Sequence, residues 1–141
     1  MSNNLTLDIV TQENSLLRVE ARSITVDTAS GEITILPGHI PLVTKLTEGL
    51  LRYTDPAGKQ DVVAVFGGFL ELDTDGVCSV LADSAVRADD IDLAKVENAR
   101  KEAEDALRDK GREAEFTLAE AALRHAALEL RAAKHKSRHA Q

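Results

Sequence analysis

The four histidines are the residues of this chain whose type best suits metal or acid–base chemistry: His39, His125, His135 and His139. Only His135 and His139 have the i, i+4 spacing that places two imidazoles on one helix face. A zinc site needs further histidine, cysteine or carboxylate ligands, and the basic segment around this pair supplies none. The histidines therefore predict no metal site. His39 follows a Pro-Gly turn, where it is either a contact residue or a turn filler.

Other patterns typical of catalysis are also missing. The sequence has no Walker-type phosphate loop and no Gly-x-Ser-x-Gly elbow. Cys78 lies in the strand-like run 76–81 and is expected to be a small buried side chain. Asp73 and Asp75 precede Gly76 as in half of a calcium loop, but no glutamate completes an EF-hand, so a plain turn is expected. We therefore predict a non-catalytic protein without a cofactor, and a small β-barrel enzyme is disfavoured.

The charge distribution argues against a nucleic-acid-binding surface on the first part of the chain. The net charge is −7, and residues 1–88 carry 12 acidic and 6 basic side chains, against 12 and 11 in residues 89–141. Nucleic-acid surfaces instead gather basic residues. The sequence has no apolar run long enough to span a membrane, and residues 1–10 lack the pattern of a secretory signal.

Composition places a domain boundary near residue 88, because seven of the eight glycines and all three prolines precede it. Strand-like runs, separated by turn signals, are found at residues 5–10, 23–27, 33–36, 50–54, 61–66, 69–72 and 77–81. A bulge or sharp bend is expected at Gly67 and Gly68. We predict a β + α fold: a ten-strand-type β-sandwich or barrel over residues 1–88, then a C-terminal antiparallel α-helical hairpin over residues 89–141.

Two helices are predicted in the second part. Residues 86–90 supply acidic N-cap candidates, Gly111 ends the first helix, and Thr117 with Glu120 has capping-box spacing for the second. The apolar stripes are Val96, Ala99, Ala103, Ala106 and Leu107 in the first helix, and Ala119, Ala122, Leu123, Ala126, Ala127, Leu130 and Ala133 in the second. Alanine favours helix formation but buries little area. Periodicity alone favours a hairpin that stays in one position on the sandwich. The alternative is a hairpin that can leave the sandwich and dock on another partner.

The segment GEITILPGHIPL at residues 31–42 joins a strand signal to a rigid turn with two prolines. GGFLE at 67–71, VLADSA at 80–85 and Ile91-Asp92 before the alanine-rich segment follow in order. This ordered set resembles the epsilon subunit of bacterial F-type ATP synthase over nearly the whole chain. The resemblance implies a central-stalk rotor subunit that couples the catalytic head to the proton-driven c-ring.

Carried over by matching motif, the resemblance implies that Thr11, His39 and Thr44 contact the gamma subunit and that Glu32 contacts the c-ring. The hairpin would fold against the sandwich when compact. When extended it would inhibit ATP hydrolysis, its basic residues meeting the alpha and beta catalytic subunits; these are Arg124, Arg131, Lys134, Lys136 and Arg138. The protein would be peripheral, at the cytoplasmic face of the bacterial inner membrane.

The sequence departs from the family motif through which some members bind ATP. Ile91 and Asp92 are present, but Lys95 and Val96 replace the arginine and alanine of that motif. His125 and Glu129 occupy the positions of a later arginine pair, beside Arg124. We therefore expect at most weak ATP binding, with Asp92, Lys95 and Arg124 as the candidate contacts. Two alternatives to a rotor subunit remain: a free-standing ATP-binding sensor, and a generic adaptor built from a sandwich and a helical hairpin.

Overall fold

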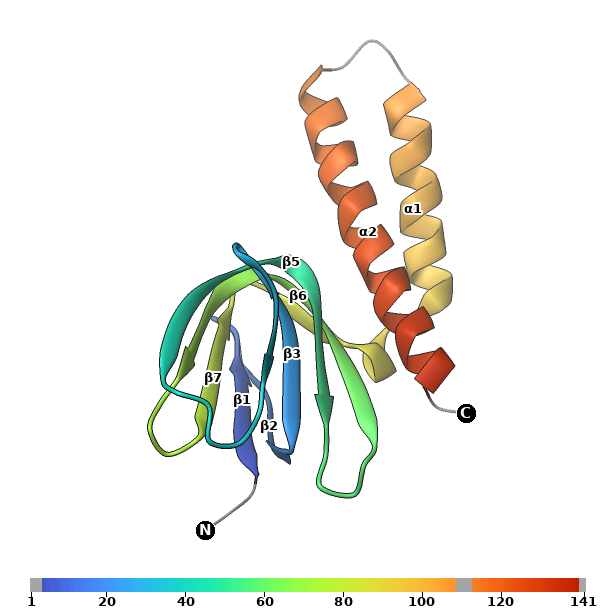
Figure 1. The fold of residues 1–141 in the computed structure, drawn as a ribbon. Helices are drawn as coiled ribbons and strands as arrows, with labels where there is room; N and C mark the ends of the chain where they lie inside the picture. Colours follow the sequence, from blue (N-terminus) through green and yellow to red (C-terminus); the bar gives the residue numbers. More distant parts are fainter. Residues whose placement is uncertain (1–3, 109–112, 140–141) are drawn as a thin grey trace.

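The computed structural model describes residues 4–108 and 113–139 and contains a β-sandwich followed by two antiparallel helices (Figure 1). This confirms the predicted fold class. The strands are β1 (Leu5–Val10), β2 (Ser15–Ala21), β3 (Ser23–Thr28), β4 (Gly31–Ile35), β5 (Leu42–Thr54), β6 (Gln60–Leu72), β7 (Val77–Ala82) and β8 (Ala85–Arg87). A 3-10 turn, η1 (Ala88–Asp90), leads to α1 (Leu93–Arg108) and α2 (Glu113–His139). The strand order is β2-β1-β7-β6-β5-β3-β4, and β8 pairs with β6.

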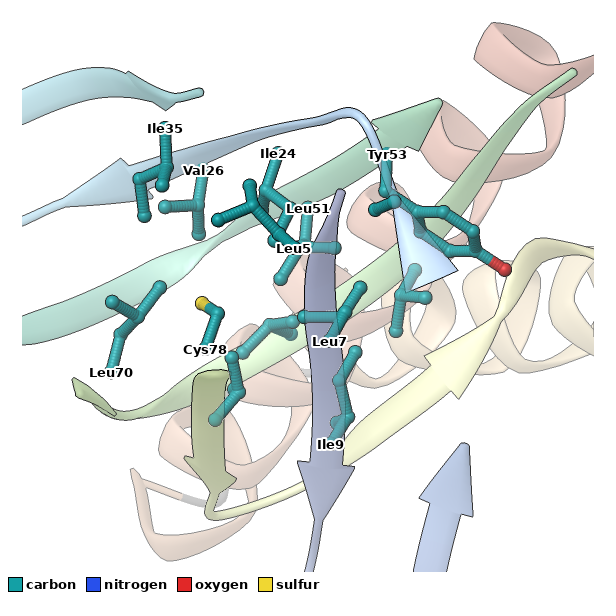
Figure 2. Packing of buried hydrophobic residues seen from close by; sticks show 14 of the residues in the cluster. Leu5, Leu7, Ile9, Ile24, Val26, Ile35, Leu51, Tyr53, Leu70 and Cys78 are labelled. Atoms are coloured by element: carbon teal, nitrogen blue, oxygen red, sulfur yellow. The ribbon is translucent and has the colours of Figure 1, made fainter. Parts of the chain in front are cut away.

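The sandwich core is aliphatic and is built from alternate residues of the strands. Leu5, Leu7 and Ile9 of β1 point into it, as do Ile24 and Val26 of β3. Figure 2 shows these side chains gathered with those of the neighbouring strands. Cys78 is fully buried among them, as the sequence predicted, and burial raises the pKa of its thiol to about 12. This cysteine is therefore a packing residue with almost no thiolate at neutral pH.

The predicted bend at Gly67 and Gly68 is present, and it changes which side chains of β6 face the core. Val63 and Val65 face inward before the glycines, whereas Leu70 and Leu72 face inward after them. Both glycines have positive φ, 88° and 129°. A Cβ at Gly68 would overlap the backbone of β7. The two glycines thus let one strand continue from one layer of the sandwich into the other.

The ten-strand expectation is wrong for the described residues, which form eight strands. The runs predicted at 61–66 and 69–72 are two halves of the 13-residue β6, and β5 begins at Leu42 rather than at Leu50. These two strands pair with each other along almost their whole lengths, so each serves both layers. Strand β2 was not predicted from the sequence, because the neighbouring residues Leu16 and Leu17 interrupt the alternation of apolar and polar side chains.

Both helix starts differ from the prediction. The N-cap of α1 is Asp92, whose Oδ1 accepts hydrogen bonds from the backbone N–H groups of Ala94 at 3.1 Å and Lys95 at 3.2 Å. The acidic residues at 89 and 90 belong instead to η1. Helix α2 begins at Glu113, so Thr117 lies inside the helix and does not cap it. The predicted stop at Gly111 lies outside the described residues.

The predicted apolar stripes are only partly buried. Val96, Ala103, Ala119 and Ala126 are buried, whereas the stripe members Ala99, Ala122 and Ala127 are exposed. Leu128 and Ala132, which the prediction omitted, are buried against the sandwich. The reason is that α2 has two neighbours, α1 on one side and the sandwich on the other (Figure 1). A single helical stripe cannot describe a helix that is covered on two faces.

We expect Gly68→Ala to lower the free energy of unfolding by about 2–4 kcal/mol, because the new Cβ meets the β7 backbone and φ is unfavourable for alanine. Urea denaturation followed by circular dichroism measures this. The matched control is Gly38→Ala, at φ 87° with open space around the Cβ position, which should cost only about 1 kcal/mol. Equal losses in the two variants would contradict the close strand approach at Gly68.

Candidate functional site

The seam between the sandwich and α2 is the place where the two parts of the protein meet. It is an apolar cluster that is separate from the sandwich core, and α1 packs on α2 rather than on the sandwich (Figure 1). Its buried members are Leu50, Val62, Ala64, Ala88, Leu128 and Ala132, with Phe66 and Ile91 partly buried against them. The outward side chains of β5 and β6 thus form the surface on which the hairpin rests.

A charged cluster at one end of the seam fastens α2 to the sandwich. Nζ of Lys136 donates to Oδ1 of Asp61 at 2.7 Å and also pairs with Asp89 of η1. Asp61 is only 8% exposed and accepts further hydrogen bonds from the hydroxyl of Tyr53 at 3.2 Å and the N–H of Val62 at 3.0 Å. Figure 2 shows the Tyr53 hydroxyl pointing out of the core cluster. We call Lys136, Asp61 and Asp89 the latch.

The electrostatics of the latch follow from these contacts. Burial works to raise the pKa of the Asp61 carboxyl, but the hydrogen bonds from Lys136, the Val62 N–H and Tyr53 outweigh it, so the pKa is lowered. Burial works to lower the pKa of Lys136, but its bonds to Asp61 and Asp89 raise it. Burial and then the Asp61 charge raise the pKa of Tyr53 to about 12. Asp61 and Lys136 are therefore both charged at neutral pH.

Two histidines of α2 also lie at the seam. The ring of His125 stacks on Phe66 with a centroid distance of 3.7 Å and an interplanar angle of 4°. Its Nδ1 lies 2.8 Å from Oε1 of Glu129 in the next helical turn. Further along, Nε2 of His135 lies 3.2 Å from Nη1 of Arg52 in β5.

The candidate ATP contacts have roles in the fold or remain exposed. Asp92 uses a carboxylate oxygen to cap α1. Lys95 and Arg124 are exposed, and Glu129 points its carboxylate at His125 rather than at a basic partner. The arrangement therefore contains no group of fixed arginines that could hold a triphosphate at these positions.

The residues predicted to contact the gamma subunit do not form one compact cluster. Thr11 follows β1 and exchanges hydrogen bonds with Asn14. His39 is exposed, and its Nδ1 lies 2.6 Å from the carbonyl oxygen of Ile40. The turn before His39 borders a cavity shared with the first residues of β1, at the end opposite Thr11. Thr44 is half-buried in β5. Any partner that contacts all three must extend along the sandwich.

Glu32, the predicted c-ring contact, is exposed on β4, and its Oε2 accepts a hydrogen bond from Nη2 of Arg52 at 2.9 Å. Among the predicted inhibitory residues, Arg124, Arg131 and Lys134 are exposed on α2. Lys136 differs, because the latch holds it in this conformation. Arg138 lies in α2, but its side chain lies outside the described residues.

The sandwich also has an exposed apolar surface that was not predicted from the sequence. Val43, Phe69 and Leu81 are 73%, 56% and 64% exposed. The register makes them neighbours, because Phe69 pairs with both Leu81 and Lys45, two residues from Val43. Adjoining exposed apolar side chains on one sheet face form a candidate interaction surface. In the sequence, each of three successive strands has one apolar residue at an outward position. Only the strand register shows that these three residues are neighbours.

The described residues contain no helix that is long and apolar enough to span a membrane, and no group of three metal-ligating side chains.

Comparison with known proteins gives consistent matches over both parts of the chain. Residues 4–88 match the family described as ATP synthase, Delta/Epsilon chain, beta-sandwich domain, and residues 89–134 match its long alpha-helix domain. The ATP synthase epsilon chain of Polynucleobacter necessarius is 39% identical over 126 residues, which cover 89% of this chain and 91% of the relative. That of Chromohalobacter salexigens is 43% identical over 124 residues, covering 88% and 87%.

Two solved structures are also similar. One chain in the Euglena gracilis mitochondrial ATP synthase, a structure of OSCP, F1 and c-ring, has a TM-score of 0.72 and 29% identity, covering 87% of this chain and 77% of that chain. A chain of the Tetrahymena thermophila mitochondrial ATP synthase central stalk and c-ring has a TM-score of 0.53 and 16% identity, covering 92% and 96%, and supports the fold alone. The sandwich, the helical pair and the matches along both lead to one conclusion: the chain belongs to the ATP synthase delta/epsilon chain family.

Proposed function

We propose that this chain is the epsilon subunit of a bacterial F-type ATP synthase, a non-catalytic rotor subunit of the central stalk that links the catalytic head to the c-ring. The observation that carries the proposal is the match of both domains, together with bacterial epsilon chains that share 39% and 43% identity over nearly their whole lengths. The Euglena relative in a structure of F1 with its c-ring supports the same assignment. The protein is then peripheral, held at the cytoplasmic face of the inner membrane by the complex.

The sandwich, residues 1–88, acts in this proposal as the foot of the stalk. The exposed surface formed by Val43, Phe69 and Leu81 suits the gamma subunit, because burying it removes a contiguous apolar area from water. Thr44 follows Val43 in β5 but pairs with the inward-facing Leu70, so its side chain lies on the other face of the strand. Thr11 and His39 extend the proposed contact along the sandwich. Glu32 is exposed enough to meet the polar loops of the c-ring.

The hairpin, residues 89–141, acts as the regulator, and the structure described here corresponds to its compact form. Release of α2 breaks the seam and frees Lys136 from the latch. It can then join the already exposed cations of α2 on acidic surfaces of the alpha and beta subunits. The apolar contribution of α2 to the seam comes chiefly from Leu128 and Ala132. Burial of the leucine side chain contributes about 1.5–3 kcal/mol, and burial of the alanine methyl group contributes about 0.8 kcal/mol. Docking on this scale is reversible. We do not expect tight ATP binding, because Lys95 and Glu129 occupy positions where ATP-binding members of the family have arginines.

The latch makes release possible without leaving a buried charge unpaired. When Lys136 leaves, Asp61 keeps its hydrogen bonds from Tyr53 and the Val62 N–H, and Arg87 lies 3.7 Å away. The sandwich side of the seam therefore remains satisfied in both conformations.

We expect Lys136→Gln to loosen the hairpin by about 1–2 kcal/mol, the scale of charge-assisted hydrogen bonds, while the sandwich stays folded. Hydrogen exchange of α2 amides should become faster by roughly 5–30-fold, and exchange in β1 should not change. The matched control is Lys101→Gln, an exposed lysine on α1, the helix that does not rest on the sandwich. Similar exchange rates in the two variants would contradict the proposal that the latch stabilises docking of α2.

The latch should also give docking a defined pH window. The pKa of Asp61 is lowered from 3.8, so its stabilisation is complete above that value and is lost as pH falls through the lower folded-state pKa. The pKa of Lys136 is raised from 10.5, so its stabilisation is complete below that value and is lost as pH rises through the folded-state pKa. In the same exchange experiment, the difference between wild type and Lys136→Gln should be constant between these limits. A difference that disappears near neutral pH would contradict this assignment.

Deletion of residues 89–141 should raise ATP hydrolysis by the assembled enzyme severalfold, because the brake is then absent. Removing the charges of Arg124, Arg131 and Lys134 together should produce part of this increase, and the inhibition should weaken at high salt. Since the deletion uncovers the apolar seam, co-purification must first show normal assembly. The matched charge control is Lys59→Gln in an exposed turn of the sandwich. Equal hydrolysis rates with and without the segment would leave the hairpin a structural role only.

Glu32→Lys should weaken the coupling of proton flow to ATP synthesis, because reversal of this exposed charge disturbs the proposed c-ring contact. ATP-driven proton pumping in membrane vesicles measures the effect, with Glu20→Lys on β2 as the control. Unchanged pumping in the Glu32 variant would rule against the contact.

A further inference from the structure

Arg52 is a single side chain that touches both the proposed c-ring contact and the hairpin. Its Nη2 donates to Oε2 of Glu32 on β4 at 2.9 Å, and its Nη1 lies 3.2 Å from Nε2 of His135 on α2. A guanidinium is always protonated and has no acceptor, so it is the donor in both bonds and His135 accepts through Nε2. One cation therefore joins β4, β5 and α2.

The surroundings of Arg52 on the hairpin side are cationic. Arg131 and Lys134 line a groove of about 220 Å³ together with Leu50 and His135. Lys136 lies on the same helix, but the latch neutralises its charge. The docked α2 therefore places two exposed cations in the same groove as His135, the residue that Arg52 contacts.

The carboxylates on the sandwich side have different roles. Asp27 of β3 accepts a hydrogen bond from the N–H of Leu50 at 3.2 Å and so supports the backbone of β5. Glu32 forms the ion pair with Arg52, and its side chain is 58% exposed, against 26% for Arg52. Glu32 is thus accessible to an outside partner while it neutralises the arginine that faces α2.

We propose that Arg52 couples the engagement of Glu32 to the docking of the hairpin. The proposal rests on the c-ring contact of Glu32 proposed above. When a cationic group of the ring takes the Glu32 carboxylate, Arg52 loses its neutralising partner, and repulsion from Arg131 and Lys134 weakens the seam. Linkage requires the reverse as well: a docked hairpin, which favours the pair between Arg52 and Glu32, holds this carboxylate back from the ring. Contact with the ring thereby favours release of the regulatory helices.

The test uses the isolated full-length protein and native-state hydrogen exchange of the α2 amides, which follows the undocked population. Glu32→Gln should accelerate exchange by about two- to fivefold, the range expected of a partly exposed ion pair. The same change in an Arg52→Gln background should have no further effect, because the partner through which it acts is gone. Glu20→Gln, an exposed carboxylate on β2, is the matched control and should resemble wild type.

Two results would overturn the coupling: Glu32→Gln that exchanges like wild type, or Glu32→Gln that accelerates exchange equally in the presence and absence of Arg52. The second result would mean that Glu32 supports the sandwich by another route. Because no ring is present, the outcome is independent of the pumping assay with Glu32→Lys. The pumping assay therefore tests the c-ring contact, and the exchange experiment separately tests the coupling through Arg52.

Discussion

The paired strands β5 and β6 impose the constraint on which the rest of the structure depends. Successive residues of a strand point to opposite faces, so this pair closes the sandwich core with Val63 and Val65 and receives α2 with Val62 and Ala64. A slip of one residue would exchange the two surfaces. The register that completes the sandwich core therefore also forms the surface on which α2 packs.

The same two strands serve a second surface beyond their bend. After Gly67 and Gly68 the pair turns into the other layer, and there its outward residues include Val43 and Phe69. The seam with α2 and the surface proposed for gamma are thus successive stretches of one continuous strand pair. A rigid connection of this kind suits the proposed role, in which the sandwich keeps its contacts while the helices are released.

The seam combines a small apolar area with a well-placed charge cluster. Buried ion pairs contribute little net stability, since desolvation offsets most of the attraction, but they specify how two surfaces fit together. The ion pair of Lys136 with Asp61 defines the position of α2 on the sandwich. When Lys136 leaves, Asp61 keeps its hydrogen bonds from Tyr53 and the Val62 N–H, so the free-energy cost of release is small. Alanine-rich helices fit the proposed release, because alanine favours the helical state. Without the seam α2 is only marginally stable, so its amides exchange faster than in the docked protein.

Local patterns in the sequence were sufficient for the two-part architecture, the buried Cys78 and the bend at Gly67 and Gly68, because alternation, helical spacing and glycine chemistry act over a few residues. The same patterns were misleading where a segment has two neighbours. Strands β5 and β6 pass through both layers, and α2 is covered on two faces, so Leu128 and Ala132 escaped a single-stripe prediction.

By itself, the sequence determined the class of the fold, the absence of familiar catalytic motifs and the resemblance to a rotor subunit. Only the tertiary structure decided which face of α2 meets the sandwich and which charges meet across the seam. Asp61 and Lys136 are 75 residues apart, and Arg52 and His135 are 83 apart. Residues this far apart in the sequence leave no periodic pattern that predicts their contact. The contact forms only when the strands pack against α2, and the local pattern of each element is the same whether or not that contact exists.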